Sequence, residues 1–176
     1  MIACWHRLYD ANPATNALIV AGGGALVILG AHGFQYGLGI QPCPLCLDQR
    51  MAYYATIPLA LLLWLSLNYG AARKVIVAGF AVTAAIMLWN AGLGGYHAGV
   101  EWHWWPGPSD CSGPINEFGP AGGLLKQLRS ISVVRCDEVS LRILGLSLAG
   151  WNMLISLALA LVAVGGARTA MRQASR

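Results

Sequence analysis

The sequence predicts an all-α membrane protein, a polytopic bundle of four membrane-spanning helices with one long loop outside the bilayer. Of its 176 residues, 57% are hydrophobic and 10% are charged, which is far from the composition of a soluble domain. The hydrophobic residues gather in four runs long enough to cross a bilayer as helices, which takes about 20 residues. No internal repeat is evident, so we expect a single membrane domain over residues 1–176.

The apolar runs set the predicted spans. These cover about residues 16–38, 47–67, 75–95 and 143–164. A cleavable signal peptide is an alternative for the first run, because Arg7 supplies a positive flank. Against this alternative, the run exceeds the usual apolar segment of a signal and no clear small-residue cleavage site follows it before Cys43.

Basic residues near the span ends predict the orientation. Four spans place both termini on one side of the membrane, together with the turn that precedes Arg73 and Lys74. That side has six basic residues against one acidic residue, whereas the other side has five basic and six acidic residues. Lys and Arg in short loops favour the cytoplasm, so we expect cytoplasmic termini. The net charge is +4, and the sequence has no basic run dense enough to suggest a nucleic-acid partner.

The long loop, residues 96–142, is rich in Pro, Gly and Trp and contains Cys111 and Cys136. Within it, apolar residues recur at helical spacing: Leu124, Leu125, Leu128 and Ile131. This pattern predicts a short amphipathic helix that lies on membrane lipid at the interface. A loop helix that packs on the bundle is the alternative.

The motif from Cys43 to Cys46 comes just before the second span. A CxxC motif is typical of a redox dithiol or of half a metal site, and inert structural disulfides are a third possibility. A zinc site needs its other ligands at comparable spacing, but Cys111 and Cys136 are 25 positions apart. Cys46 lies at the start of a helix, where the helix dipole stabilises a thiolate. We therefore favour redox chemistry, with Cys4 as a reduced bystander on the cytoplasmic side.

Two further residues are candidates for this site. Arg50 lies one helical turn after Cys46 on the same face, where it could stabilise the thiolate and hold a polar oxygen of an electron acceptor. The alternative for Arg50 is an arginine that snorkels from a span end. His97 follows the third span at the same membrane level, where it could hydrogen-bond a carbonyl or supply a proton. The alternative for His97 is a surface residue without a catalytic role.

This arrangement resembles the DsbB family of bacterial disulfide bond formation proteins. The resemblance covers about residues 16–164 and rests on four features taken together: the motif within residues 41–46, Arg50 downstream of it, the stretch 96–102, and the loop pair Cys111 and Cys136. It implies a quinone-dependent protein thiol:disulfide oxidoreductase of the bacterial inner membrane, with ubiquinone or menaquinone as the cofactor and no metal. The partner that it implies is a periplasmic thioredoxin-fold protein of the DsbA type.

The resemblance also implies a role for each residue. Cys111 takes the mixed disulfide with the partner, and Cys136 pairs with Cys111 in the resting state. The electrons then pass to the pair of Cys43, which meets the loop thiol, and Cys46, which faces the quinone. Arg50 and His97 correspond to quinone-side residues of the family.

Two other functions are also compatible with the sequence. A vitamin K epoxide reductase-like enzyme also couples disulfides to a quinone, but there we expect the CxxC motif late in the bundle. A non-enzymatic membrane protein would use its cysteines as metal ligands or as structural disulfides.

Overall fold

The computed structural model describes residues 12–108 and 135–172, and the expected interfacial helix, Cys4 and Cys111 lie outside these ranges. Within them, four helices are long and apolar enough to cross a membrane. The helices are α2 (Pro13–His32), α3 (Pro44–Asn68), α4 (Arg73–Glu101) and α6 (Leu148–Arg172). A π-helical turn, η1 (Gly33–Gly37), extends α2, and strands β1 (Arg142–Ile143) and β2 (Leu146–Ser147) precede α6. The predicted four-helix membrane fold is confirmed.

Two helix starts follow from local capping chemistry. The side chain of Asn12 accepts a hydrogen bond from the backbone N–H of Ala14 at 3.1 Å, and Pro13 occupies the first turn of α2. At α3, Cys43 is the capping residue and Pro44 opens the helix. Proline suits this position because its missing N–H has no partner inside the helix and its φ is already helical. The local sequence therefore determines that the cysteine motif lies at the start of α3.

Helix α4 is longer than the predicted span, at Arg73–Glu101 against residues 75–95. Residues 96–101 contain no proline, and the helix continues through them until Trp102. His97 consequently lies inside α4, near its end, and not in the loop that follows the helix. The six extra residues place its side chain on the helical face that Asn90 and Gly94 also occupy, as the spacing of three and four residues requires.

Helix α6 begins at Leu148, five residues after the start of the predicted span, because the preceding residues form a hairpin. Strands β1 and β2 pair antiparallel, with Ile143 opposite Leu146. The two residues between them have left-handed backbone, with φ of 52° at Leu144 and 83° at Gly145. Positive φ at both central positions is typical of a tight hairpin turn, where glycine is the favoured residue.

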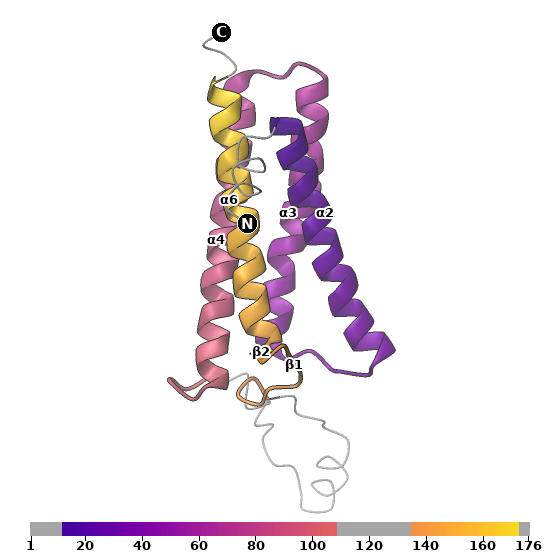
Figure 1. Cartoon of the computed structure of the whole chain (residues 1–176), viewed down its shortest axis with the longest axis vertical. Helices are drawn as coiled ribbons and strands as arrows, with labels where there is room; N and C mark the ends of the chain where they lie inside the picture. Colours follow the sequence, from indigo (N-terminus) through magenta and orange to yellow (C-terminus); the bar gives the residue numbers. More distant parts are fainter. Residues whose placement is uncertain (1–11, 109–134, 173–176) are drawn as a thin grey trace, which may run out of the picture.

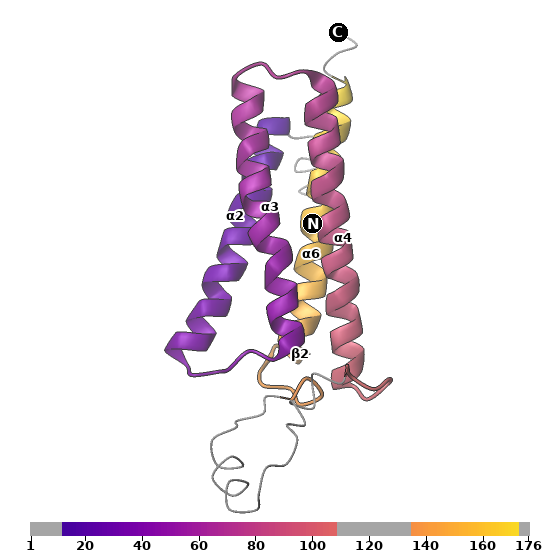
Figure 2. The same ribbon diagram turned by 180° about the vertical axis from the view of Figure 1, so that it is seen from behind.

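The helices pack in two close pairs, α4 with α6 and α2 with α3, and α3 also packs on α4. Figures 1 and 2 show α2 leaning away from α6 toward the end of the bundle where η1 lies. The core of the opposite end consists mostly of alanine and other aliphatic side chains around Phe80, and Val20, Phe80 and Ala163 are fully buried there. Close packing of small residues is the usual way in which membrane helices associate.

Gly94 permits a close approach of α4 to α6. A Cβ atom at this position would lie 2.9 Å from the backbone nitrogen of Met153, a contact that only a backbone shift can relieve. Gly92, on the same helix, has open space around the corresponding position. The first glycine is therefore required by packing, and the second is not.

We expect Gly94→Val to destabilise the protein by about 1–3 kcal/mol, because the added side chain overpacks the α4–α6 contact. Gly92→Val is the matched control, since it has the same helix-propensity change without the clash. Thermal unfolding of both variants in the same detergent measures the difference. Equal melting temperatures for the two variants would show that α4 and α6 do not approach as closely as described.

A polar network joins α3, α4 and α6 within the bundle. The Tyr53 hydroxyl donates to Asn152 Oδ1 at 2.7 Å, and Asn90 Nδ2 donates to Ser156 Oγ at 2.9 Å. Tyr53 and Ser156 are themselves 2.9 Å apart through their hydroxyl oxygens. Hydrogen bonds between membrane helices fix which faces meet, although each contributes only about 0.6 kcal/mol on average.

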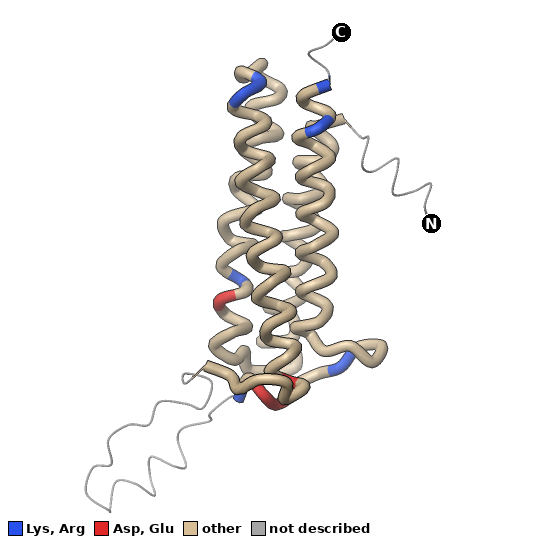
Figure 3. The backbone as a smooth tube through the Cα atoms, turned by 90° about the vertical axis from the view of Figure 1, so that its left-hand side faces the viewer, with Lys and Arg blue, Asp and Glu red and all other residues tan. Residues whose placement is uncertain are grey.

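The two ends of the bundle differ in character. Basic residues cluster at the end formed by the start of α4, with Arg73 and Lys74, and by the end of α6, with Arg168 and Arg172. Figure 3 shows this basic end opposite the end where the hairpin and the start of α3 lie. The cysteine motif is therefore at the end of the bundle away from this basic cluster.

Candidate functional site: a cysteine pair beside an apolar cavity

Cys43 and Cys46 face each other across the first turn of α3. Both are free cysteines, and the Cys43 thiol donates a hydrogen bond to Cys46 Sγ at 2.8 Å. The Cys43 sulfur in turn accepts a hydrogen bond from the backbone N–H of Cys46 at 3.3 Å. The hydrogen bond to Cys46 and burial raise the pKa of the Cys43 thiol. In the dithiol form, Cys43 therefore keeps its proton, and negative charge is favoured on Cys46, at the positive end of the helix dipole.

Cys136 is far from Cys43 in the sequence but lies next to it in the structure. The sulfur atoms of Cys43 and Cys136 and a ring nitrogen of His97 all lie within 4.8 Å of one another. Cys136 is 1% exposed and disulfide-bonded. Leu45 and Val100 pack around these sulfurs and exclude water from them. The structure thus places a sulfur of the long loop beside the inner cysteine pair.

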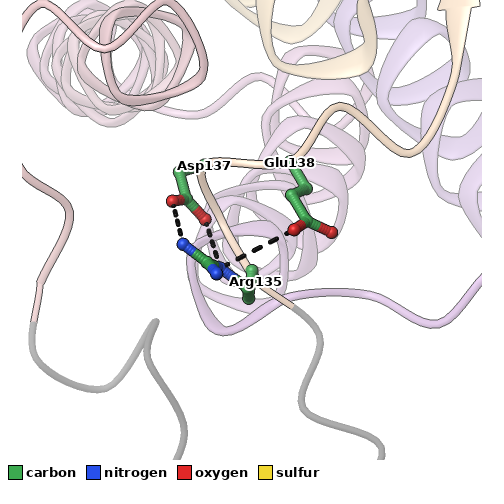
Figure 4. A network of polar contacts seen from close by, with 3 residues as sticks. All are labelled: Arg135, Asp137 and Glu138. Carbon is green, nitrogen blue, oxygen red and sulfur yellow. Dashed lines mark hydrogen bonds and ion pairs between the residues drawn. The ribbon is translucent and has the colours of Figure 1, made fainter.

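Charged neighbours of Cys136 form a surface ion-pair network, shown in Figure 4. The Arg135 guanidinium donates two hydrogen bonds to Asp137, at 2.6 and 3.0 Å, and lies 3.8 Å from Glu138. The Arg135 guanidinium lowers the pKa of the Asp137 carboxyl. Because Arg135 is exposed, solvent screens the pair and its contribution to stability is small.

An apolar cavity of about 340 Å³ opens between α2, α3 and α6 on the other side of the inner pair. Its lining is mostly hydrophobic, from residues such as Val27, Phe34 and Ile155. The polar exceptions include Gln49, Arg50, Tyr53 and Asn152, and the sulfur-bearing residue on its wall is Cys46. Its size falls within the range of small-molecule sites, about 300–1,000 Å³, and its few polar groups amid apolar walls are typical of such sites.

Arg50 is held at the cavity by helix α2 and the π-helical turn that follows it. One guanidinium nitrogen of Arg50 donates to Gln35 Oε1 at 2.6 Å, and another to the backbone oxygen of Ala31 at 3.5 Å. Gln35 is in η1, and π-helical turns are frequent at functional sites. A guanidinium has five N–H groups, so donors remain for a ligand in the cavity.

His97 lies on the far side of Gln49 from the cavity, and it is not among the residues that line it. Its Nε2 is 3.6 Å from Cys43 Sγ, and its Nδ1 is 2.8 Å from the amide nitrogen of Gln49. The sequence pattern predicted the cysteines, Arg50 and His97 as site residues, but it did not predict Gln35 or Gln49. Only the partners that they contact, 15 and 48 positions away, reveal what these two glutamines do.

The cluster of Cys43, His97 and Cys136 also has the composition of a metal site. A cysteine ligates a metal as its thiolate, and the sulfur of Cys136 is bonded to another sulfur. In this state the cluster offers two ligands at most, fewer than the four of a structural zinc site. The geometry therefore suits sulfur exchange better than metal binding.

The chain is similar to known disulfide bond formation proteins. The chain matches the family described as "Disulfide bond formation protein DsbB" over residues 13–165. Disulfide bond formation protein B of Xanthomonas oryzae pv. oryzae (strain MAFF 311018) is 30% identical over 144 residues, which cover 78% of this chain and 80% of that protein. The protein of the same name from Xylella fastidiosa (strain 9a5c) is 30% identical over 130 residues, covering 70% of this chain and 72% of that protein. No solved structure matches.

Proposed function

Because this chain belongs to the DsbB family of disulfide bond formation proteins, we propose that it passes electrons from a DsbA-type dithiol protein, through two cysteine pairs, to a membrane quinone. One observation carries the proposal. The inner pair has one sulfur against the loop cysteine Cys136 and its other cysteine, Cys46, on the wall of an apolar cavity. This is the arrangement that a relay between a protein thiol and a lipid-soluble acceptor requires.

The cavity residues fit a quinone ring. Its walls are apolar, as the ring and its isoprenoid tail require, and Arg50 can donate a hydrogen bond to a ring oxygen. Gln35 fixes the direction of the Arg50 guanidinium, so this donor is preorganised. A bound quinone supplies the oxidising power, since it accepts two electrons and two protons. Cys46 is the cysteine at this wall and therefore the donor of the electrons to the quinone.

The thiol chemistry proceeds by two sulfur exchanges. The thiolate of the partner attacks Cys111 Sγ, the Cys111–Cys136 bond breaks, and Cys136 leaves as a thiolate. Cys136 then attacks Cys43 in the oxidised Cys43–Cys46 pair, which forms the Cys43–Cys136 bond and leaves the electron pair on Cys46 Sγ. The pairing of Cys111 with Cys136 is part of this proposal, because Cys111 lies outside the described residues.

The orientation completes the proposal. The end of the bundle formed by the α3–α4 turn and the end of α6 carries the basic cluster, which favours the cytoplasm. The cysteine site at the other end then faces the periplasm of a bacterial inner membrane, where a DsbA-type protein can reach it. The periplasm is oxidising, so disulfides form and persist there.

A turnover assay tests the function. The purified protein is mixed with a reduced DsbA-type protein and ubiquinone-1 or a soluble menaquinone analogue, and quinone loss is followed by absorbance. We expect catalytic loss of one quinone per dithiol oxidised. No loss with either quinone, together with one bound zinc per chain, would instead support the metal-ligand function.

Arg50→Lys tests the cavity. Lysine keeps the charge but loses the planar fork that bonds Gln35, Ala31 and a ring oxygen together. We expect the KM for quinone to rise about ten-fold, the effect of one lost hydrogen bond to a charged group, with a smaller change in kcat. Gln35→Ala should raise the same KM less, because the guanidinium remains but is no longer fixed.

Arg135→Lys is the matched control, since Arg135 is exposed and away from the cavity. It should leave the KM for quinone unchanged. If Arg50→Lys also left this KM unchanged, the quinone would not bind against Arg50.

A further inference from the structure

The imidazole of His97 is buried between the inner cysteine pair and the loop cysteine. It is 3% exposed, and its Nε2 lies 3.6 Å from Cys43 Sγ. The same cluster contains Cys136 Sγ, within 4.8 Å of both. Gln49 stands between this ring and the cavity. Contact of His97 with the quinone stays a prediction, whereas its contacts with the exchange sulfurs are present in the structure.

The hydrogen bonds of the ring determine which nitrogen carries the proton. The amide N–H of Gln49 donates to Nδ1 at 2.8 Å, so Nδ1 is the acceptor and the proton of the neutral ring is on Nε2. The Nε2–H is therefore the donor that faces Cys43 Sγ, and the sulfur of Cys136 lies in the same cluster.

We propose that His97, oriented by Gln49, stabilises the sulfur charge during the exchange between Cys136 and Cys43. This inference rests on the proposed function and assigns His97 to the exchange between the two cysteine pairs. When the partner takes Cys111, the leaving sulfur of Cys136 is already a thiolate, so the step needs no base. The Nε2–H faces the sulfurs between which the Cys43–Cys136 bond forms, with Cys43 Sγ at 3.6 Å and Cys136 Sγ in the same cluster, so it stabilises the negative charge as that charge leaves Cys136.

Gln49 has a separate positioning role in this arrangement. If its amide did not donate to Nδ1, the ring could place its proton there and present a bare lone pair to Cys43 Sγ, so that the exchange sulfurs would lose their donor. Both groups are nearly fully buried, Gln49 at 5% exposure, so water does not replace the lost contact. The glutamine therefore selects the tautomer that the exchange requires.

The experiment measures the exchange directly. The quinone-free oxidised protein is mixed with a reduced DsbA-type protein that keeps only its attacking cysteine. Samples are quenched with acid, alkylated and mapped by mass spectrometry for the Cys43–Cys136 disulfide. We expect His97→Phe to slow its appearance about 10- to 100-fold, as loss of a hydrogen bond to a charged group predicts, and His97→Gln to retain most of the rate because its amide still donates.

Two further variants separate positioning from general damage. Gln49→Leu should slow the exchange, and Gln49→Glu, of the same size as glutamine, should slow it too, because an ionised carboxylate accepts from Nδ1–H and leaves Nε2 of the neutral ring without a proton. Arg135→Ala, which removes an exposed charge next to Cys136, should change the rate less than two-fold. These variants remain informative if His97→Phe does not fold.

A second readout distinguishes a role of His97 in the sulfur exchange from contact with the quinone. Dithiothreitol can reduce the inner pair directly, so quinone loss driven by dithiothreitol bypasses Cys136. We expect His97→Phe to leave this reaction within two-fold of the wild type. An unchanged exchange rate in His97→Phe, or an equal loss in the dithiothreitol reaction, would overturn the inference. Absence of quinone loss in the wild type would instead refute the proposed function, independently of the exchange rate.

Discussion

Replacing Cys46 with serine is expected to reduce quinone reduction below about 0.1% of the wild-type rate, because the thiolate is the reacting species and a serine hydroxyl is not ionised at neutral pH. Cys46 is the sulfur-bearing residue on the cavity wall, and Cys43 points away from the cavity toward Cys136. No other sulfur among the described residues can take its place. The loss should therefore be the same with the protein partner and with dithiothreitol as the electron donor.

Cys4→Ser is the matched control for this variant. It removes a cysteine that we place on the cytoplasmic side, and it should leave both reactions unchanged. Thermal unfolding of the two variants shows whether either loss reflects misfolding. Quinone loss that persists in Cys46→Ser with either donor would refute the route through Cys46.

Cys136→Ser is expected to abolish oxidation of the protein partner while sparing quinone reduction driven by dithiothreitol. The loop sulfur is the one that reaches Cys43, and Cys43 itself is 4% exposed, too deeply buried for a folded partner to attack. A small dithiol can still reach the half-buried Cys46. We therefore expect partner oxidation to fall at least about a thousand-fold, with the dithiothreitol reaction within about three-fold of the wild type.

The two donors are measured on the same preparation, with quinone loss as the common readout. Arg135→Ala controls for disturbance of the loop next to Cys136. Partner oxidation that survives in Cys136→Ser would show that the partner reaches the inner pair directly. Loss of both reactions in a folded Cys136→Ser protein would show that Cys136 belongs to the inner site itself.

The features that the sequence predicted well depend on local spacing. Proline is favoured at the first position of a helix, and Pro44 follows the capping residue Cys43. The local sequence therefore predicts that Cys43 and Cys46 lie at the first turn of α3. Arg50 shares a face with Cys46 because four residues make one helical turn, and both line the cavity. Apolar run length likewise predicts the four spans.

The features that were missed depend on contacts between elements. Gln35 matters because the π-helical turn directs it at Arg50, and the amide of Gln49 matters because His97 lies on a different helix. Spacing along one element cannot reveal either contact. The hairpin before α6 was also missed, because its strands have two residues each, too short to show an alternating pattern.

Disulfide mapping of the trapped complex tests the central claim, that electrons pass from Cys136 through Cys43 to Cys46. The quinone-free wild-type protein is mixed with the single-cysteine partner, quenched with acid and alkylated before digestion. We predict that Cys43 is linked to Cys136 and that Cys46 is alkylated, with the partner attached at Cys111. An intact Cys43–Cys46 disulfide, with Cys136 alkylated in the same complex, would contradict the relay.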